Sequence, residues 1–219
     1  MTLPFTTEQF LEVFRQYNTS VWPMQVLLTA LAVATVTAAA RGVGGRFVAL
    51  SLAAQWAWTG VVYHWMFFAP VNPAAKLFAV LWLAGAAAFA WNGLGKRPLA
   101  FGGVRRSRLL IAGALIGYAL VVYPIIGHFG GRAYPYGPTY GAPCPVTITT
   151  LGLLWLARSS PRHLLVAPLL WAAIASVAAF SLGVIEDTGL LLAGLSGVFL
   201  ALRPAATGQP SSTVTGERV

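Results

Sequence analysis

The amino-acid sequence predicts an all-α, polytopic membrane protein of about seven transmembrane helices, with its N-terminus outside and its C-terminus in the cytoplasm. Of the 219 residues, 58% are hydrophobic and only 9% are charged, whereas a soluble domain carries about 25% charged residues. A chain this short cannot hide so much apolar surface from water. Long apolar runs recur along the chain, and basic residues gather in alternate loops between them. These observations together predict a helical bundle with lipid as its main solvent.

The apolar runs define the expected transmembrane helices, because a helix needs about 20 mostly apolar residues to cross a hydrocarbon core of about 30 Å. The runs are residues 21–40, 47–68, 74–91, 109–126, 146–157, 164–182 and 188–202. The last two are separated at Glu186 and Asp187, because one continuous helix would overshoot the bilayer and bury two carboxylates. The fifth is short and follows Pro143 and Pro145, which donate no backbone hydrogen bonds. We therefore expect a non-helical or distorted turn at residues 142–145.

The distribution of basic residues indicates the orientation. With the N-terminus outside, only Arg15, Lys76 and Arg132 fall in outer segments. Eleven others fall in cytoplasmic loops and the tail: Arg41, Arg46, Lys96, Arg97, Arg105, Arg106, Arg108, Arg158, Arg162, Arg203 and Arg218. Cytoplasmic loops of membrane proteins are enriched in lysine and arginine. These basic clusters are the source of the net charge of +9, and in cytoplasmic loops they would contact anionic lipid. We therefore expect the lipid bilayer, and no nucleic acid, as a partner.

Composition divides the chain into three segments. Residues 1–20 are predicted to form an outer amphipathic or interfacial segment, in which Thr6 and Gln9 have the spacing of a capping box; alternatively, this segment extends the first transmembrane helix. Residues 21–203 hold the seven-helix bundle. Residues 204–219 are rich in Pro, Ser, Thr and Gly, which predicts a disordered cytoplasmic tail.

Most chemically capable side chains are expected near the outer end of the bundle. Polar groups inside a bilayer are costly and tend to mark function. The candidate ligand-binding residues are Tyr63, His64, Tyr123, His128 and Asp187. Residues 128–144 are rich in Gly, Pro and Tyr, and we expect them to form an ordered lid over this site.

A transition-metal site is a second interpretation of the same residues. His64, His128, Cys144 and Asp187 offer imidazole, thiolate and carboxylate ligands that suit zinc or copper. Their spacing matches no recognised metal motif. The alternatives are that His64 hydrogen-bonds a neighbouring helix and that Cys144, the single cysteine, packs as a small apolar residue or acts as a nucleophile.

Four sequence blocks resemble a family of bacterial multi-pass membrane proteins that is known only as a domain of unknown function. The blocks are residues 4–10 (PFTTEQF), 58–64 (WTGVVYH), 134–145 (YPYGPTYGAPCP) and 186–190 (EDTGL). The resemblance covers the chain from Pro4 to about Leu202, and its Pro-Cys-Pro block is the most specific part. It implies a multi-pass protein of the bacterial cytoplasmic (inner) membrane, and it brings no activity, cofactor or catalytic residue.

Three functions remain open at this point. The first is binding or transport of a small polar ligand or ion at a site near the outer face. The second is a metal-dependent or thiol-dependent membrane enzyme that uses the same cluster. The third is a structural or assembly protein without a ligand. The sequence has no phosphate-binding loop, nucleotide fingerprint or HExxH motif, which favours a non-enzymatic role.

Overall fold

The computed structural model describes residues 4–203, and every regular element in this range is helical. The elements are α1 (Thr7–Ala40), α2 (Gly45–Trp58), the π-helix η1 (Thr59–Phe68), α3 (Ala75–Leu94), α4 (Arg106–Gly117), the π-helix η2 (Tyr118–Val122), α5 (Tyr123–Phe129), α6 (Pro143–Leu156), α7 (Arg162–Leu182), the 3₁₀ turn η3 (Ile185–Asp187) and α8 (Thr188–Leu202). The predicted all-α fold is therefore confirmed. The tail predicted at residues 204–219 lies outside the described residues.

Five helical segments are long and apolar enough to cross a membrane: Thr7–Ala40, Ala75–Leu94, Arg106–Phe129, Arg162–Leu182 and Ile185–Leu202. Two further helical segments, the α2–η1 segment and α6, are not among these five. η1 follows α2 without a break, because Trp58 and Thr59 both have right-handed helical backbone angles. α6 is apolar but has only 14 residues.

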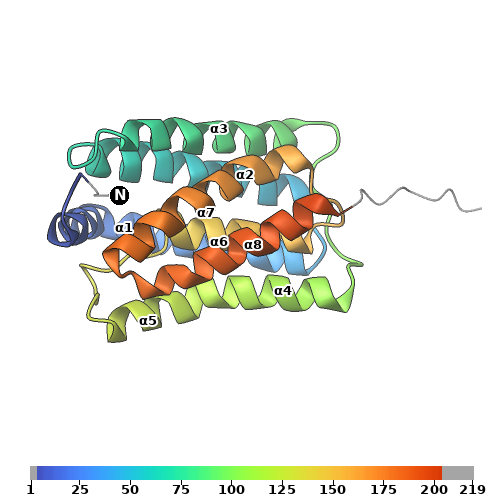
Figure 1. The fold of residues 1–219 in the computed structure, drawn as a ribbon. Coiled ribbons are helices and arrows are strands. Elements are labelled where there is room, and N and C mark those ends of the chain that lie inside the picture. The colour runs from blue at the N-terminus through green and yellow to red at the C-terminus, as the bar shows by residue number, and fades with distance from the viewer. Residues whose placement is uncertain (1–3, 204–219) are drawn as a thin grey trace, which may run out of the picture.

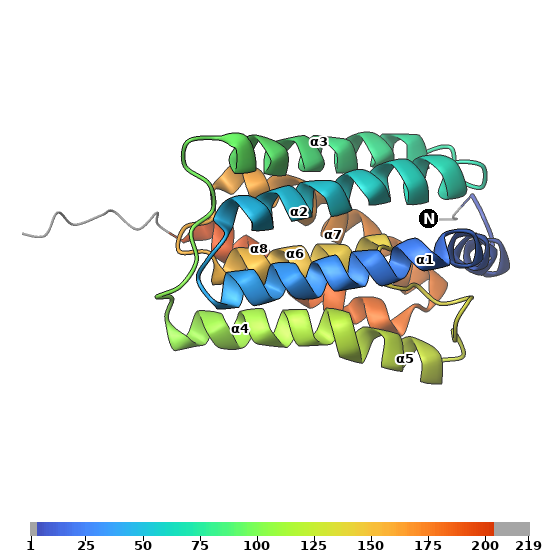
Figure 2. The ribbon, with the colours of Figure 1, turned by 180° about the vertical axis from the view of Figure 1, so that it is seen from behind.

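The helices run along one common axis and form a single bundle around α6 (Figures 1 and 2). α6 packs against α1, α2, α4, α7 and α8, and nearly all of its side chains are buried. Such a central position explains why α6 is apolar on every face rather than amphipathic.

The bundle has two chemically different ends. One end, the arginine end, holds the α1–α2, α3–α4 and α6–α7 connections and the end of α8, where most basic residues lie. The other, the loop end, holds the start of α1, residues 130–142 and η3. All acidic residues within 4–203 belong to the loop end: Glu8, Glu12, Glu186 and Asp187.

α1 bends at Val21, where the backbone leaves helical geometry (φ −118°, ψ 15°), two residues before Pro23. The part before the bend lies across the loop end (Figure 2). Its start carries the predicted capping box, since the Thr6 hydroxyl accepts from the Gln9 N–H and the Gln9 amide oxygen accepts from the Thr6 N–H. This part of α1 packs its rings on η1, with Phe14 and Tyr63 centroids 5.5 Å apart.

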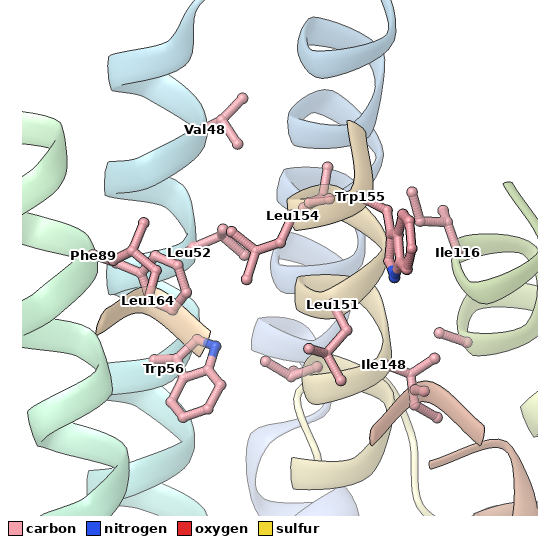
Figure 3. Packing of buried hydrophobic residues seen from close by; sticks show 14 of the residues in the cluster. Val48, Leu52, Trp56, Phe89, Ile116, Ile148, Leu151, Leu154, Trp155 and Leu164 are labelled. Carbon is pink, nitrogen blue, oxygen red and sulfur yellow. The ribbon is translucent and has the colours of Figure 1, made fainter. Parts of the chain in front are cut away.

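The half of the bundle near the arginine end has a closely packed apolar core. Figure 3 shows Leu154 and Trp155 of α6 between Leu52 of α2 and Ile116 of α4. Leu52, Leu154 and Trp155 are at most 1% exposed. Packing of this density leaves little room for polar groups or water in this half.

Candidate ligand-binding site

The loop end contains a cavity of about 200 Å³, far larger than the ~15 Å³ that one water molecule needs. Its wall combines the first turns of α1 and α6 with parts of η1, α7 and η3. Most of the lining side chains are apolar or aromatic. The polar lining residues are Tyr63, Asn72, Tyr123, Cys144, Ser181 and Asp187.

A carboxylate, a phenol and a thiol meet on one wall of this cavity. The Tyr123 hydroxyl donates to Asp187 Oδ1 at 2.6 Å, and Cys144 lines the same cavity as both residues. These residues come from the first turns of α5 and α6 and from η3. Their convergence makes this wall the most polar part of an otherwise apolar cavity.

The start of α6 places Cys144 on this wall. α6 begins at Pro143, so within the stretch 142–145, which was predicted to be non-helical or distorted, only Ala142 has extended backbone angles (φ −75°, ψ 157°). The prediction failed because prolines are tolerated in the first turn of a helix, where the N–H groups have no helical partner in any case. Pro143 and Pro145 therefore start α6 instead of breaking it.

η3 is fixed by an ion pair one residue before Asp187. Arg132 Nε and Nη2 donate to Glu186 Oε1 and Oε2 at 2.8 and 2.5 Å, and the Glu186 side chain is fully buried. The Tyr118 hydroxyl also donates to the Glu186 carbonyl at 2.6 Å. The Glu186 carboxylate raises the pKa of the Arg132 guanidinium, so Arg132 stays charged. These contacts hold the carboxyl of Asp187 in a fixed place.

Residues 130–142 form an ordered cover that is bonded to α1. The Asn18 amide donates to the Pro135 and Gly137 carbonyls at 2.6 and 2.7 Å, and its oxygen accepts from the Thr139 hydroxyl and from Gln25. Sequence reasoning did not single out Asn18 or Gln25. Their seven-residue spacing, which puts two amides on one face of an apolar helix, is the signal that could have found them.

His64 lies next to the cavity without lining it. The side chain is fully buried, and neither ring nitrogen has a hydrogen-bond partner within residues 4–203. Aromatic rings surround it: its centroid lies 4.7 Å from that of Trp171, 5.6 Å from that of Trp82 and 5.9 Å from that of Phe78. The alternative prediction, a hydrogen bond from His64 to a neighbouring helix, is therefore wrong for residues 4–203.

His128 does not line the cavity that contains Cys144 and Asp187. It is exposed at the end of α5 and lines another hollow, of about 210 Å³, with Tyr123, Arg132 and Tyr134. Within residues 4–203, no three His, Cys, Asp or Glu side chains converge on a point that could hold a metal. The four residues expected to bind zinc or copper, His64, His128, Cys144 and Asp187, therefore do not converge on one point.

The remaining candidates do come together. Tyr63, Tyr123 and Asp187, which were predicted as ligand-binding residues, line one cavity with Cys144. They were selected by the chemistry of their side chains and by their expected depth in the membrane, and depth distinguishes residues at the two ends of a bundle.

Comparison with known proteins gives a family and no activity. The sequence profile of a family of unknown function (DUF6064) matches residues 7–210. No curated protein and no solved structure matches the chain. The resemblance to a domain of unknown function is thereby confirmed.

Proposed function

Because this chain belongs to the DUF6064 family of unknown function, we propose its function from the geometry of the cavity at the loop end. The proposal is that the protein binds, or carries across the membrane, a small ligand with a polar and preferably cationic group. The polar wall of Tyr63, Tyr123, Cys144 and Asp187 would recognise that group.

The proposed setting is the bacterial cytoplasmic membrane, crossed seven times, with the loop end outside and the arginine end in the cytoplasm. The continuous α2–η1 helix and the central α6 would add two spans to the five long helices. The concentration of basic residues at the arginine end supports this orientation.

The observation that carries the proposal is that Asp187 faces the cavity without a counter-ion among residues 4–203. Its carboxyl lines the cavity and accepts from Tyr123. Within residues 4–203 it forms no salt bridge, because the nearby Arg132 is paired with Glu186. A carboxylate with a hydrogen-bond donor but no counter-ion favours a ligand that brings a positive charge or a strong donor.

The packed core near the arginine end supports binding as the primary event. Leu52, Leu154 and Trp155 are buried and packed together in the half of the bundle near that end (Figure 3). Transport of the ligand would require a second arrangement of these helices, since close-packed side chains leave no passage.

A thiol-dependent enzyme is the second candidate, favoured by the presence of the Cys144 thiol and the Asp187 carboxyl in the same cavity. In this role the thiol would attack as a nucleophile once a base has accepted its proton. The variant Cys144→Ala separates the two candidates. An enzyme would turn over its ligand in the wild type and lose that turnover in the variant while binding persists, whereas a binding protein would turn over nothing in either form.

The test of binding uses Cys144 as a reporter, because it is the sole cysteine of the chain. Purified protein in lipid nanodiscs is treated with N-ethylmaleimide, with or without n-hexylamine, n-hexanol or hexanoate. We expect the amine alone to protect the thiol, slowing labelling about tenfold when its concentration is ten times its Kd. Asp187→Asn should abolish the protection, whereas Glu8→Gln, an exposed carboxylate of the same end, should retain it. Equal labelling with every compound, or equal protection in Asp187→Asn, would overturn the proposal.

A further inference from the structure

We propose that the cavity opens sideways into the lipid bilayer along α7 and that its ligand is a single-chain amphiphile. Its aliphatic chain would occupy the opening on α7, and its cationic or hydrogen-bond-donating head would reach Asp187. This inference rests on the proposed function, because it names the chemical class and the access route of the ligand for the same cavity.

One face of α7 forms the opening. Ile174, Val177, Ala178 and Ser181 all line the cavity, and their spacing of three, four and seven residues puts them on a single helix face. The first two are nevertheless 39% and 60% exposed. Residues that line a cavity and are also exposed mark the place where its wall is incomplete.

This face points toward lipid rather than toward water. α7 is one of the five helices long and apolar enough to span a membrane. Other exposed side chains of the same helix are also large and apolar, such as Val166, Leu170 and Phe180. Exposed apolar residues on a spanning helix contact acyl chains, so a gap on this face is filled by a chain and not by an aqueous solute.

The side of the cavity that faces the start of α1 and the loop, in contrast, is covered. Phe5 and Phe14 line it and are only 8% and 5% exposed. The rings of Phe5 and Phe68 pack at 5.4 Å between centroids. Pro138 and Ala142 of the loop are buried beside them. An aqueous solute would have to displace this aromatic layer.

The lining chemistry matches a ligand with two different ends. Aromatic and aliphatic side chains make up most of the wall, and the carboxyl, phenol and thiol are grouped together. A fully polar solute would leave most of this wall in unfavourable contact with polar atoms, whereas a simple hydrocarbon would leave the carboxyl unpaired. An amphiphile satisfies both parts.

The access route is tested with two thiol reagents of equal chemistry on the full chain in lipid nanodiscs. Decyl methanethiosulfonate partitions into the bilayer, and 2-(trimethylammonium)ethyl methanethiosulfonate stays in water. With either reagent the Cys144 thiolate attacks the sulfenyl sulfur, a mixed disulfide forms and methanesulfinate leaves, so intact-protein mass reports the rate. We expect the decyl reagent to modify Cys144 at least about tenfold faster than the charged reagent when both rates are normalised to the reagent concentration at the membrane surface. This ratio corresponds to about 1.4 kcal/mol.

A matched pair of variants locates the opening. Ala178→Trp places a large ring on the lining face, and Ala173→Trp places the same ring on an exposed face of α7 that does not line the cavity. Ala178→Trp should slow the decyl reagent about tenfold and remove protection of Cys144 by dodecylamine, whereas Ala173→Trp should change neither.

The contrary results separate this inference from the proposed function. If the charged reagent reacts as fast as the decyl reagent and Ala178→Trp slows neither, the cavity opens to water and the inference is overturned. Protection by hexylamine that depends on Asp187 would then still support the binding site. If instead the decyl reagent is slowed by Ala178→Trp but no amine of any length protects Cys144, the amphiphilic ligand and the proposed function both fail.

Discussion

Arg132 and Glu186 form a two-pronged ion pair between the loop of residues 130–142 and the α7–α8 turn, 54 residues apart in the sequence. Arg132 is 15% exposed and Glu186 is fully buried. Through this pair the loop that covers the cavity and the turn that carries Asp187 are held as one unit.

Removing Arg132 should destabilise the protein strongly. Arg132→Met leaves the buried Glu186 carboxylate without a counter-ion, which costs about 3–5 kcal/mol in comparable cases. The double variant Arg132→Met, Glu186→Met should recover most of this loss, because it removes both charges. Thermal unfolding in nanodiscs measures the change. Arg15→Met is the control, because its partner Glu12 lies on the exposed part of α1; an equal loss in that variant would show that the ion pair at η3 has no special weight.

Asn18→Ala should loosen the loop. The variant loses the bonds from Asn18 to the Pro135 and Gly137 carbonyls, and each carbonyl left unpaired in a buried place costs about 1–3 kcal/mol. Limited proteolysis should cut residues 130–142 faster, and N-ethylmaleimide should label Cys144 faster. Thr19→Ala should change neither rate, because the Thr19 hydroxyl, within residues 4–203, donates only to carbonyls of its own helix. Unchanged proteolysis in Asn18→Ala would mean that other contacts hold the loop.

Gly141→Ala should cost more than Gly131→Ala, although both glycines have positive φ in the same loop (99° and 82°). A Cβ on Gly141 would lie 2.8 Å from Leu28 Cδ1 and 3.0 Å from the Tyr17 hydroxyl, whereas one on Gly131 would meet nothing within 4 Å. Both variants carry the backbone strain, and the crowding at Gly141 adds about 1–3 kcal/mol. Equal unfolding temperatures for the two variants would show that the contacts at Gly141 relax freely.

His64→Phe should leave stability unchanged or raise it. The imidazole nitrogens have no partner within residues 4–203, so the substitution removes buried polar atoms and keeps an aromatic ring among Trp82 and Trp171. Gln55→Met is the contrasting variant, because it removes the acceptor of the Tyr140 hydroxyl and should cost about 1–3 kcal/mol. A large loss in His64→Phe would reveal that the imidazole is hydrogen-bonded to a bound molecule.

The fold was predictable because it depends on local pattern. The run at residues 109–126 corresponds to the helical segment Arg106–Phe129, and the split at Glu186 and Asp187 is the observed η3 turn. Apolar length alone decides such elements. The five long helices follow from it, whereas α6 is too short for its role to be read from length.

The site was predictable only in part, because depth along a helix is readable and direction around the bundle is not. Three residues lie at a similar depth and line the same cavity: Tyr123, Cys144 and Asp187. His64 shares the depth but faces α3 and α7, and His128 is exposed at a helix end. The role of Asn18 was hidden because its loop partners lie 117 and 119 residues away.

The shortness of α6 has an electrical consequence in the proposed membrane arrangement. Fourteen residues span about 21 Å at 1.5 Å per residue, which is less than the hydrocarbon thickness of about 30 Å. A helix of this length leaves at least one of its ends inside the hydrocarbon layer, where the transmembrane voltage has a gradient, and each elementary charge that crosses the whole layer is worth about 2.3 kcal/mol per 100 mV. A cation held at Asp187 would sit inside this gradient, so its affinity in proteoliposomes should change with the imposed potential, while that of an uncharged amphiphile should not.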